Sequence, residues 1–488
     1  MNEHRVPPTV TAPPRRRRWL RWLFVFLLIF IGLPSAYYFY TSWSLKAEIA
    51  RAMAETDALD PRWRFEDIEA DRKPIRDEDN SALQIIKIVG LIGRTGARTP
   101  MHHKHYGEVF GERPATAQLN PQQIQMIREI FEKNAEGLAE ARKLKDMPHG
   151  RFPITWDPTG PWALLPDHHE VRTICDLLQH DAMLKAQFGD PDAALESCLA
   201  HLNAARSLED DPFMVSLAIR VACDSLLVQT LERIMANGSP QHVALQTVQD
   251  RLATERADLG DHWITAVRGE RAEFHRFFEP LIQGKTRWLQ MAESLRMRVT
   301  LQDQLAHYLP TLLTKDYPQH LRLRNEQAAA ARLPMAQQFE QFAIINKKVD
   351  RSNRRKADLA QVLPLLPADL RGSCRAHLQG QALLAAAEAG LACERYRLIH
   401  KRWPESLTEL VNAKLLDAAP TDPFDGQPLR LIRRKDDLTV YSVGIDKIDH
   451  GGDIATSRPL DAGADLGFRL WDPDKRRQPP RPPVPLAD

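Results

Sequence analysis

The sequence has little of what identifies a function directly: few aromatic residues, no strong charge excess and no familiar catalytic motif. Aromatic residues make up 7% of its 488 residues, and 66 basic against 64 acidic residues leave a formal charge of +2. This balance excludes the basic excess of a typical nucleic-acid-binding protein, so no nucleic acid is expected among its partners. The chain also lacks a Walker A loop, a GxSxG elbow, a GxGxxG turn and an HExxH motif. Nothing therefore indicates a nucleotide-binding protein, an α/β-hydrolase or a zinc protease.

Cysteine is also scarce, and no CxxC pair is present. The five cysteines are Cys175, Cys198, Cys223, Cys374 and Cys393. Each lies in a stretch whose apolar residues recur with helical spacing, which predicts buried thiols. A disulfide between Cys374 and Cys393 stays open, because disulfides are stable outside the cytoplasm.

The longest uncharged run, Trp22–Tyr40, is 19 residues long. As an α-helix it measures about 28 Å, the thickness of the hydrocarbon core of a bilayer. Arginines at positions 15–18 and 21 precede it, and tryptophan and tyrosine residues flank both ends. The positive-inside rule then predicts one membrane-spanning helix over 19–43, with a basic cytoplasmic tail over 1–18. We expect the bulk of the chain on the periplasmic side of the inner membrane, with the lipid bilayer as the first partner.

Two alternative interpretations of this run fit less well. A cleaved signal peptide has the same order of basic, apolar and small residues, with Ser35–Ala36 as a poor cleavage site. The run is longer than a usual signal core, however, and Pro34 disfavours cleavage there. A buried core helix fits less well, because the run follows a Pro/Arg-rich arm and has no polar face.

The rest of the chain is rich in helix-forming residues and is predicted to be mainly α. A membrane-proximal region over 44–166 mixes helices with irregular segments, and a helical-hairpin domain follows over 167–367. Three turns punctuate that domain: Gly189-Asp190-Pro191, Asp211-Pro212 and Gly238-Ser239-Pro240. Each is predicted to cap and open a helix, so that consecutive helices lie antiparallel. The run AMLKAQFGDPDAALESCLAHLNAARSL resembles a tetratricopeptide hairpin.

After an Ala-rich helix predicted over 368–400, the sequence changes character. Pro404 lies early in a short helix whose leucines can cover the end of the long one. The run Asp422–Gly426 is a tight turn by composition. Strand-like residues follow on both sides of a second turn at Lys435–Asp437. They predict a small antiparallel sheet that packs against the Ala-rich helix.

Several positions of this part also match a known pattern in order. They are Tyr396, Trp403, Pro404, Leu407, Leu410, Asp422, Pro423, Phe424, Gly426, Pro428, Tyr441, Ser442, Gly444 and Asp446. The module over 368–474 thereby resembles the C-terminal part of type II secretion pseudopilins, and that of many uncharacterised bacterial membrane-anchored proteins. The resemblance implies an α+β module. The membrane run lacks the Phe-Thr-Leu-x-x-Glu start of pseudopilins, so a pilus subunit is not expected.

The resemblance also implies a calcium site, because major pseudopilins bind Ca²⁺ in the corresponding loop. The candidate ligands are Asp446, Asp449, Asp453 and Asp465. Carboxylate oxygens on a flexible turn are ligands that Ca²⁺ prefers. Lys447 stands where the family has glycine and adds a positive charge. A solvated Asp/Gly turn is the alternative.

Two histidine-rich stretches could ligate a transition metal. The first holds His102, His103 and His105. The second, Asp167-His168-His169-Glu170, begins a helix, with His180 about three turns later. Packed or solvated histidines are the alternative in both places. The first stretch has no HExxH or paired-Cys partner, and histidine on a helix is usually only packed or solvated.

The preferred interpretation is a single-pass, membrane-anchored envelope protein that acts as a non-catalytic scaffold for protein partners. One alternative is a component associated with type II secretion or pili that recruits partners through the module over 368–474. Another is an envelope hydrolase with a site in the helical body, because catalytic groups assembled from distant positions leave no motif. The last segment, 475–488, contains QPPRPPVP and is predicted to be polyproline-like and disordered.

Overall fold

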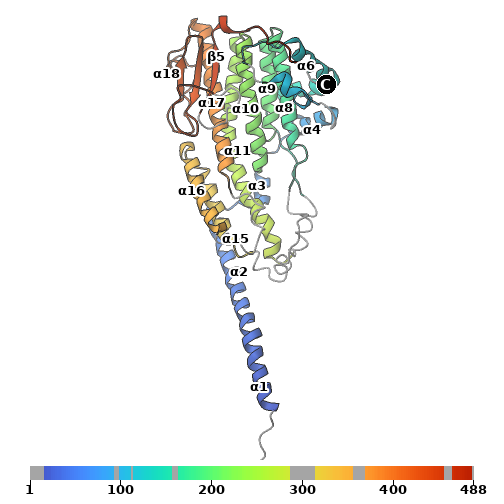
Figure 1. The fold of residues 1–488 in the computed structure, drawn as a ribbon, viewed down its shortest axis with the longest axis vertical. Helices are drawn as coiled ribbons and strands as arrows, with labels where there is room; N and C mark the ends of the chain where they lie inside the picture. Colours follow the sequence, from blue (N-terminus) through green and yellow to red (C-terminus); the bar gives the residue numbers. More distant parts are fainter. Residues whose placement is uncertain are drawn as a thin grey trace, which may run out of the picture.

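The computed structural model describes residues 16–92, 98–111, 114–156, 163–285, 314–354, 369–454 and 464–485. Figure 1 shows a long N-terminal helix that extends from one end of a body of long helices packed side by side. A small sheet covers one flank of this body. The protein is mainly helical, as the composition predicts.

The long helices are α2 (Leu33–Leu59), α8 (His168–Gln187), α9 (Pro191–Arg206), α10 (Met214–Asn237), α11 (His242–Ile282), α16 (Met335–Arg354) and α17 (Arg371–His400). The shorter ones are α1 (Arg16–Leu27), α3 (Phe65–Asp71), α4 (Ser81–Ile92), α5 (Tyr106–Phe110), α6 (Pro121–Lys133), α7 (Ala135–Arg142), α15 (Tyr317–Ala330) and α18 (Leu407–Asn412). Single helical turns are η1 (Leu28–Gly32), η2 (Asp77–Asp79), η3 (Pro100–His102), η4 (Lys143–Asp146) and η6 (Pro473–Lys475). The strands are β1 (Thr155–Trp156), β2 (Ala163–Leu164), β3 (Arg430–Arg433), β4 (Asp437–Ser442) and β5 (Leu466–Trp471).

The N-terminal helix is continuous from α1 through the π-helical turn η1 into α2. Between Trp19 and Trp43 its large apolar side chains point outward, and Trp22 is 73% exposed. By length and composition this helix is a candidate membrane span. Among the described residues α10 passes the same test, but 67% of its apolar window is buried inside the body. The alternative of a buried core helix therefore fits α10 and not the N-terminal run.

The end of α2 that is farther from the N-terminus belongs to the body. Ile49 and Ala52 pack there with Trp63 and with apolar residues of α11 and α15. Arg322 of α15 adds ion pairs to Glu48 at 2.8 Å and to Glu55 at 2.7 Å. Apolar burial and ion pairs together attach this end of α2 to the body.

Helices α8 to α11 are the four helices predicted from residue 167 onward. The Asp190 side chain accepts a hydrogen bond from the Ala193 N–H, and Pro191 opens α9, as predicted. The other two turns differ from the prediction. Helix α10 begins at Met214 without a side-chain cap, because Asp211 is buried and bound elsewhere, and α11 begins at His242, beyond Pro240.

Helix α17 is the centre of the core, and it contacts α10, α11, α16 and strands β4 and β5. Strands β3, β4 and β5 form an antiparallel sheet in that order. A Cβ atom at Gly390 of α17 would lie 2.3 Å from the Phe468 ring of β5, so only glycine permits this close approach. The predicted sheet on the Ala-rich helix is confirmed. One hydrophobic core runs from α8 to β5 across the predicted boundary at 367/368.

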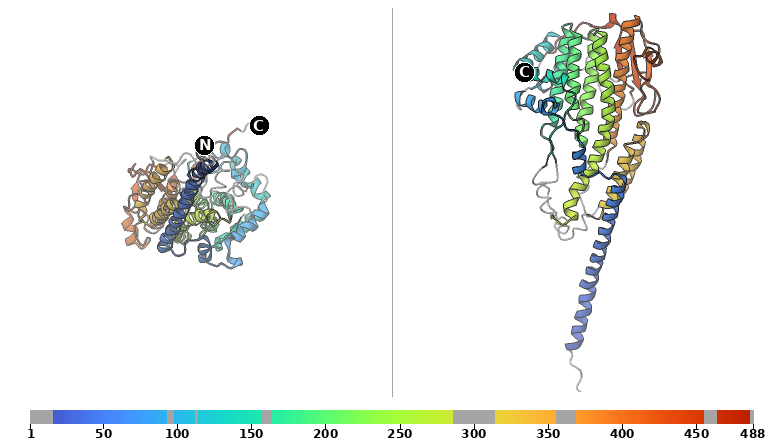
Figure 2. Two further views of the ribbon diagram at one scale, coloured as in Figure 1. Left: turned by 90° about the horizontal axis from the view of Figure 1, so that it is seen from below. Right: turned by 180° about the vertical axis from the view of Figure 1, so that it is seen from behind.

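The C-terminal segment differs from the predicted disordered tail over its described residues, which end at 485. The Arg476 guanidinium is buried and pairs with Glu394 of α17 at 2.9 Å. Backbone hydrogen bonds then join Gln478 to the segment at Thr116 and Gln118. Farther along, Val484 is bound to the Gln122 side chain. Figures 1 and 2 both put this end beside α6, on the flank opposite the sheet.

All five cysteines are buried and free, as predicted for thiols. The disulfide left open between Cys374 and Cys393 does not form, because both lie on α17. Nineteen residues of helix separate their Cα atoms by about 28 Å, and a disulfide needs less than about 7 Å.

Candidate functional site

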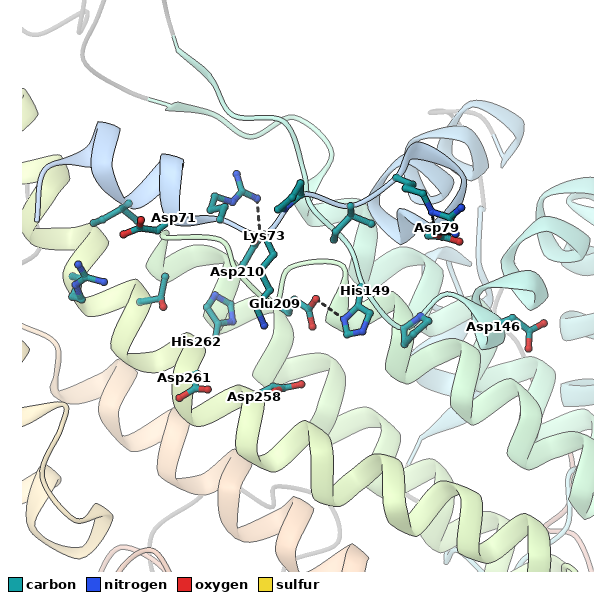
Figure 3. Close-up of a pocket in the computed structure, with 18 residues that line it drawn as sticks. Asp71, Lys73, Asp79, Asp146, His149, Glu209, Asp210, Asp258, Asp261 and His262 are labelled. Atoms are coloured by element: carbon teal, nitrogen blue, oxygen red, sulfur yellow. Dashed lines mark hydrogen bonds and ion pairs between the residues drawn. The ribbon is translucent and has the colours of Figure 1, made fainter. Parts of the chain in front are cut away.

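A cleft of about 750 Å³ lies beside α11. One wall is the face of α11 from Asp258 to Arg268, which is about 15 Å long at 1.5 Å per residue. The other wall is the end of α3 and the segment 72–79, which we call the strap. The turn after α9 and the segment 146–149 complete it (Figure 3). Its size suits a small molecule or a short peptide segment.

The α11 wall follows from helical spacing. Asp258, Asp261, His262, Thr265 and Arg268 recur at intervals of three or four residues, so they share one face of the helix. Asp261 is exposed, whereas the neighbouring His262 is only 1% exposed. This face of α11 therefore presents charged side chains at the surface of the cleft, with the polar side chain of His262 buried beneath them.

Arg206, at the end of α9, organises two acidic groups of the cleft. Its guanidinium pairs with Asp258 at 2.7 Å and with Glu209 at 3.0 Å. It also donates to buried Glu255 at 2.9 Å, and Arg220 binds the other oxygen of Glu255 at 2.7 Å. Arg206 is only 1% exposed, so these charge-assisted bonds lie in a low dielectric and fix the positions of both carboxylates.

Arg72 attaches the strap to the body in a similar way. Its guanidinium donates to Asp210 and to buried Asp211, both at 2.9 Å. Asp211 also binds His168 and accepts a hydrogen bond from Ser216 at 3.0 Å. Because Asp211 satisfies three partners from different elements, the strap and the turn after α9 have a fixed relative position.

The environment of the cleft shifts several titrations. Burial raises the pKa of Glu209 and of Asp210, although Arg206 opposes the first shift and Arg72 the second. Burial lowers the pKa of His262 well below its usual value, and the charge of Arg220 adds to this. His262 is therefore neutral, and its Nε2–H donates to the Asp211 carbonyl at 2.9 Å.

The cleft has an excess of negative charge. Seven of its eighteen lining residues are Asp or Glu, and four are Arg or Lys. Three of those four cations have carboxylate partners: Arg72, Arg76 and Arg268. The carboxylates of Asp146 and Asp261 form no ion pair or hydrogen bond with any described residue. No Trp, Tyr or Phe side chain is among the described lining residues, so the cleft suits a charged ligand and not an aromatic one.

The four aspartates predicted to bind calcium lie elsewhere, in the loop after β4. Asp446 accepts a hydrogen bond from the Ile448 N–H, and Asp449 accepts from the Gly451 N–H and the Tyr441 hydroxyl. Asp465 is buried and accepts from the Gly452 N–H at 2.7 Å. Asp453 is exposed. Among the described residues no group of three or more His, Cys, Asp or Glu could hold a metal, so the calcium hypothesis gains no support.

Several histidines of the two predicted metal sites are bound to protein groups instead. His102 is bound to Thr99 at 2.8 Å, and buried His180 contacts Asp176 and Tyr106. The structure does bring together His102 and His169, which line one cavity of about 310 Å³ with Glu170. Glu170 is already paired with Arg98 at 2.7 Å. Neither predicted metal site is formed by the described residues.

The residues of the cleft were missed by sequence reasoning. The one readable signal is the spacing of Asp258, Asp261 and His262, which puts three polar groups on one face of a long helix. Glu209, His149 and Lys73 come from other segments, and no local pattern joins them to α11.

Comparison with known proteins adds no relative: no family model, no curated protein and no solved structure matches the chain.

Proposed function

We propose that the chain is a membrane-anchored, non-catalytic scaffold that binds a protein partner through the acidic cleft. The partner would present lysine or arginine side chains in an extended segment. The apolar N-terminal helix supports the anchor, and the arginines before it support a cytoplasmic N-terminus with the body in the envelope space. The end of α2 that packs into the body then connects the anchor to the part of the protein that contains the cleft.

The observation that carries this proposal is the state of the carboxylates. The cleft has three more acidic than basic residues, and Asp146 and Asp261 have no described partner. An excess of unpaired negative charge in a concave site attracts cations and steers them in. The wall of about 15 Å matches four or five residues of an extended chain, at about 3.3 Å each.

A defined peptide tests the binding. The full-length protein, purified in detergent, is titrated with a fluorescent Gly-Ser-Lys-Gly-Ser-Lys peptide, with the same peptide carrying Glu for Lys as the negative probe. We expect the lysine peptide alone to bind, and binding to weaken as salt rises. The double variant Asp146→Asn/Asp261→Asn should bind about tenfold more weakly, a change of about 1.4 kcal/mol.

The control is a second pair of exposed acidic residues away from the cleft, Glu132→Gln/Asp417→Asn, which should bind like the parent protein. Equal loss in both double variants would show that only overall charge matters and would overturn the assignment to the cleft. No binding of the lysine peptide would overturn the proposed function itself.

The topology needs its own test. A reporter that is active only outside the cytoplasm, fused after Asp488, should be active, and a fluorescent protein at the N-terminus should report the cytosol. The intact mass of the membrane-extracted protein distinguishes a retained anchor from a cleaved signal. Release of the protein by salt alone, without detergent, would contradict the anchor.

A hydrolase is a second candidate, favoured by one observation. Glu209 and Asp210 are neighbouring carboxyls with pKa values raised by burial, and Asp258 lies across Arg206 from Glu209. Carboxyls with raised pKa values in one cleft are typical of acid–base catalysis. A screen of ester, amide and glycoside substrates with the parent protein and Glu209→Gln tests this. Turnover that the variant lacks would favour the hydrolase over the scaffold.

A further inference from the structure

One cation of the cleft stands apart from the others. Lys73 forms no side-chain hydrogen bond or ion pair with any described residue, although seven acidic residues line the same cleft. Its side chain extends from the strap toward the α11 face, where His262 and Asp261 lie (Figure 3). An ammonium group in this setting is available to an anion that enters the cleft.

The backbone of Lys73 is held on both sides. Arg72 is bound to Asp210 and Asp211, and Pro74 restricts the chain that follows. The Arg151 guanidinium also donates to the carbonyl oxygens of Arg72 and Lys73, at 3.1 and 3.4 Å. The main chain at Lys73 is therefore held by its neighbours, while its amine has no partner among the described residues.

The opposite wall offers the reverse charge. Asp261 is exposed on the α11 face and has no partner among the described residues, so an available carboxylate faces the available cation of Lys73 across the cleft. A ligand that satisfies both must carry an anion and a cation. An internal lysine or arginine of a partner brings only the cation. A C-terminal lysine or arginine brings both the cation and the α-carboxylate, separated by the length of its side chain.

We propose that the cleft recognises the C-terminal lysine or arginine of a partner protein, with its α-carboxylate at Lys73 and its side-chain cation at Asp261. This inference rests on the proposed function and adds the identity of the recognised group. Capture of a C-terminal carboxylate is an established mode of peptide recognition, and the Lys73 ammonium has the complementary charge. It also explains why one lysine is kept in a cleft that otherwise favours cations.

The test compares three forms of one peptide on the full-length protein in detergent. They are Gly-Ser-Lys-Gly-Ser-Lys with a free C-terminus, the same peptide amidated, and the same peptide extended by Ser-Gly so that both lysines are internal. We expect the free form to bind about tenfold more tightly than either other form. Lys73→Met should lower the affinity for the free form to that of the amidated form, and Lys73→Arg should restore the preference.

Lys104→Met is the matched control, because Lys104 is exposed and has no described partner, and it should keep the full preference. Lys73 is itself exposed, and unchanged thermal unfolding would verify that its variants fold. If the parent protein binds the three peptides equally, recognition of the terminus is wrong while the basic-segment scaffold stands. If none of them binds, both proposals fail.

Discussion

Acidic residues gather in two regions, the cleft beside α11 and the loops of the sheet, and these regions use their carboxylates differently. In the loop after β4, carboxylates accept hydrogen bonds from backbone N–H groups a few residues away. In the cleft, arginines from distant segments bind them: Arg72 reaches Asp210, and Arg206 reaches Asp258. Local amides shape a turn, whereas distant guanidinium groups join elements. Only the carboxylates that neither kind of donor has engaged are available to a ligand.

The largest effect is expected where distant charges are joined. Arg206→Met removes a buried guanidinium and leaves Glu255 with one arginine partner and Asp258 with none. The free energy of unfolding should fall by about 3–5 kcal/mol. Urea unfolding followed by circular dichroism measures it. The control is Arg51→Met, which breaks an exposed pair with Glu48 and should cost less than about 1 kcal/mol. Equal effects of the two variants would contradict the comparison.

A smaller loss is expected in the sheet region. Buried Asp422 accepts hydrogen bonds from the Phe424 and Val443 N–H groups, at 3.0 and 2.9 Å, and from the Ser442 hydroxyl. Asp422→Ala leaves these donors without a partner, and the free energy of unfolding should fall by about 2–4 kcal/mol. Asp446→Ala removes one exposed turn bond and should change it by less than about 0.5 kcal/mol. If Asp422→Ala lowers the free energy of unfolding only slightly, water replaces the carboxylate as the partner of these donors.

The pH dependence of stability sharpens the comparison further. Burial raises the pKa of Glu232, beside β5, from 4.5 to about 7, although Arg469 opposes the shift. In the folded protein this carboxyl therefore keeps a proton that it releases in the unfolded chain. The stabilisation that the retained proton gives is lost as pH rises from about 4.5 through about 7. Glu232→Gln should raise the melting temperature by about 2 °C at pH 8 and leave it unchanged at pH 5. If the melting temperatures of the parent and the variant differ by the same amount at every pH, the assignment of this pH dependence to Glu232 is wrong.

The smallest effect is expected from calcium. The calcium prediction rests on a resemblance, and Asp446, Asp449 and Asp465 already accept hydrogen bonds from the protein. Millimolar Ca²⁺ should therefore raise the melting temperature by less than about 1 °C, because a ligand stabilises only in proportion to its occupancy. A rise of several degrees that Asp446→Ala/Asp453→Ala abolishes would instead establish the site.

Much of the fold could be predicted because its signals are local. Asn120 before Pro121 forms the capping box of α6, and Asp190 before Pro191 caps α9, each through bonds within three residues. The same kind of signal misled at Asp211-Pro212. There the carboxylate binds Arg72 and His168 from other segments instead of capping α10, and no local pattern encodes that preference.

The site was far less predictable than the fold. Of the cleft, the sequence could show only the polar face of α11, because its residues repeat with the helical period. Whether a carboxylate there is paired depends on Arg206 and Arg72, which reach it across the body. The resemblance to pseudopilins predicts a site in the loop after β4 instead, where Asp449 and Asp465 already accept hydrogen bonds from backbone N–H groups. A family relationship to pseudopilins stays a prediction.

The sequence by itself determined the apolar N-terminal helix, the mainly helical body and the small sheet on the Ala-rich α17, because periodicity and turn composition act over a few residues. Only the tertiary structure decided that the strap, the turn after α9 and the α11 face meet in one cleft. It also decided that Lys73 and Asp261 have no partner among the residues that the structure describes. Which charges are neutralised is a property of three-dimensional neighbours, and spacing along the chain does not specify them.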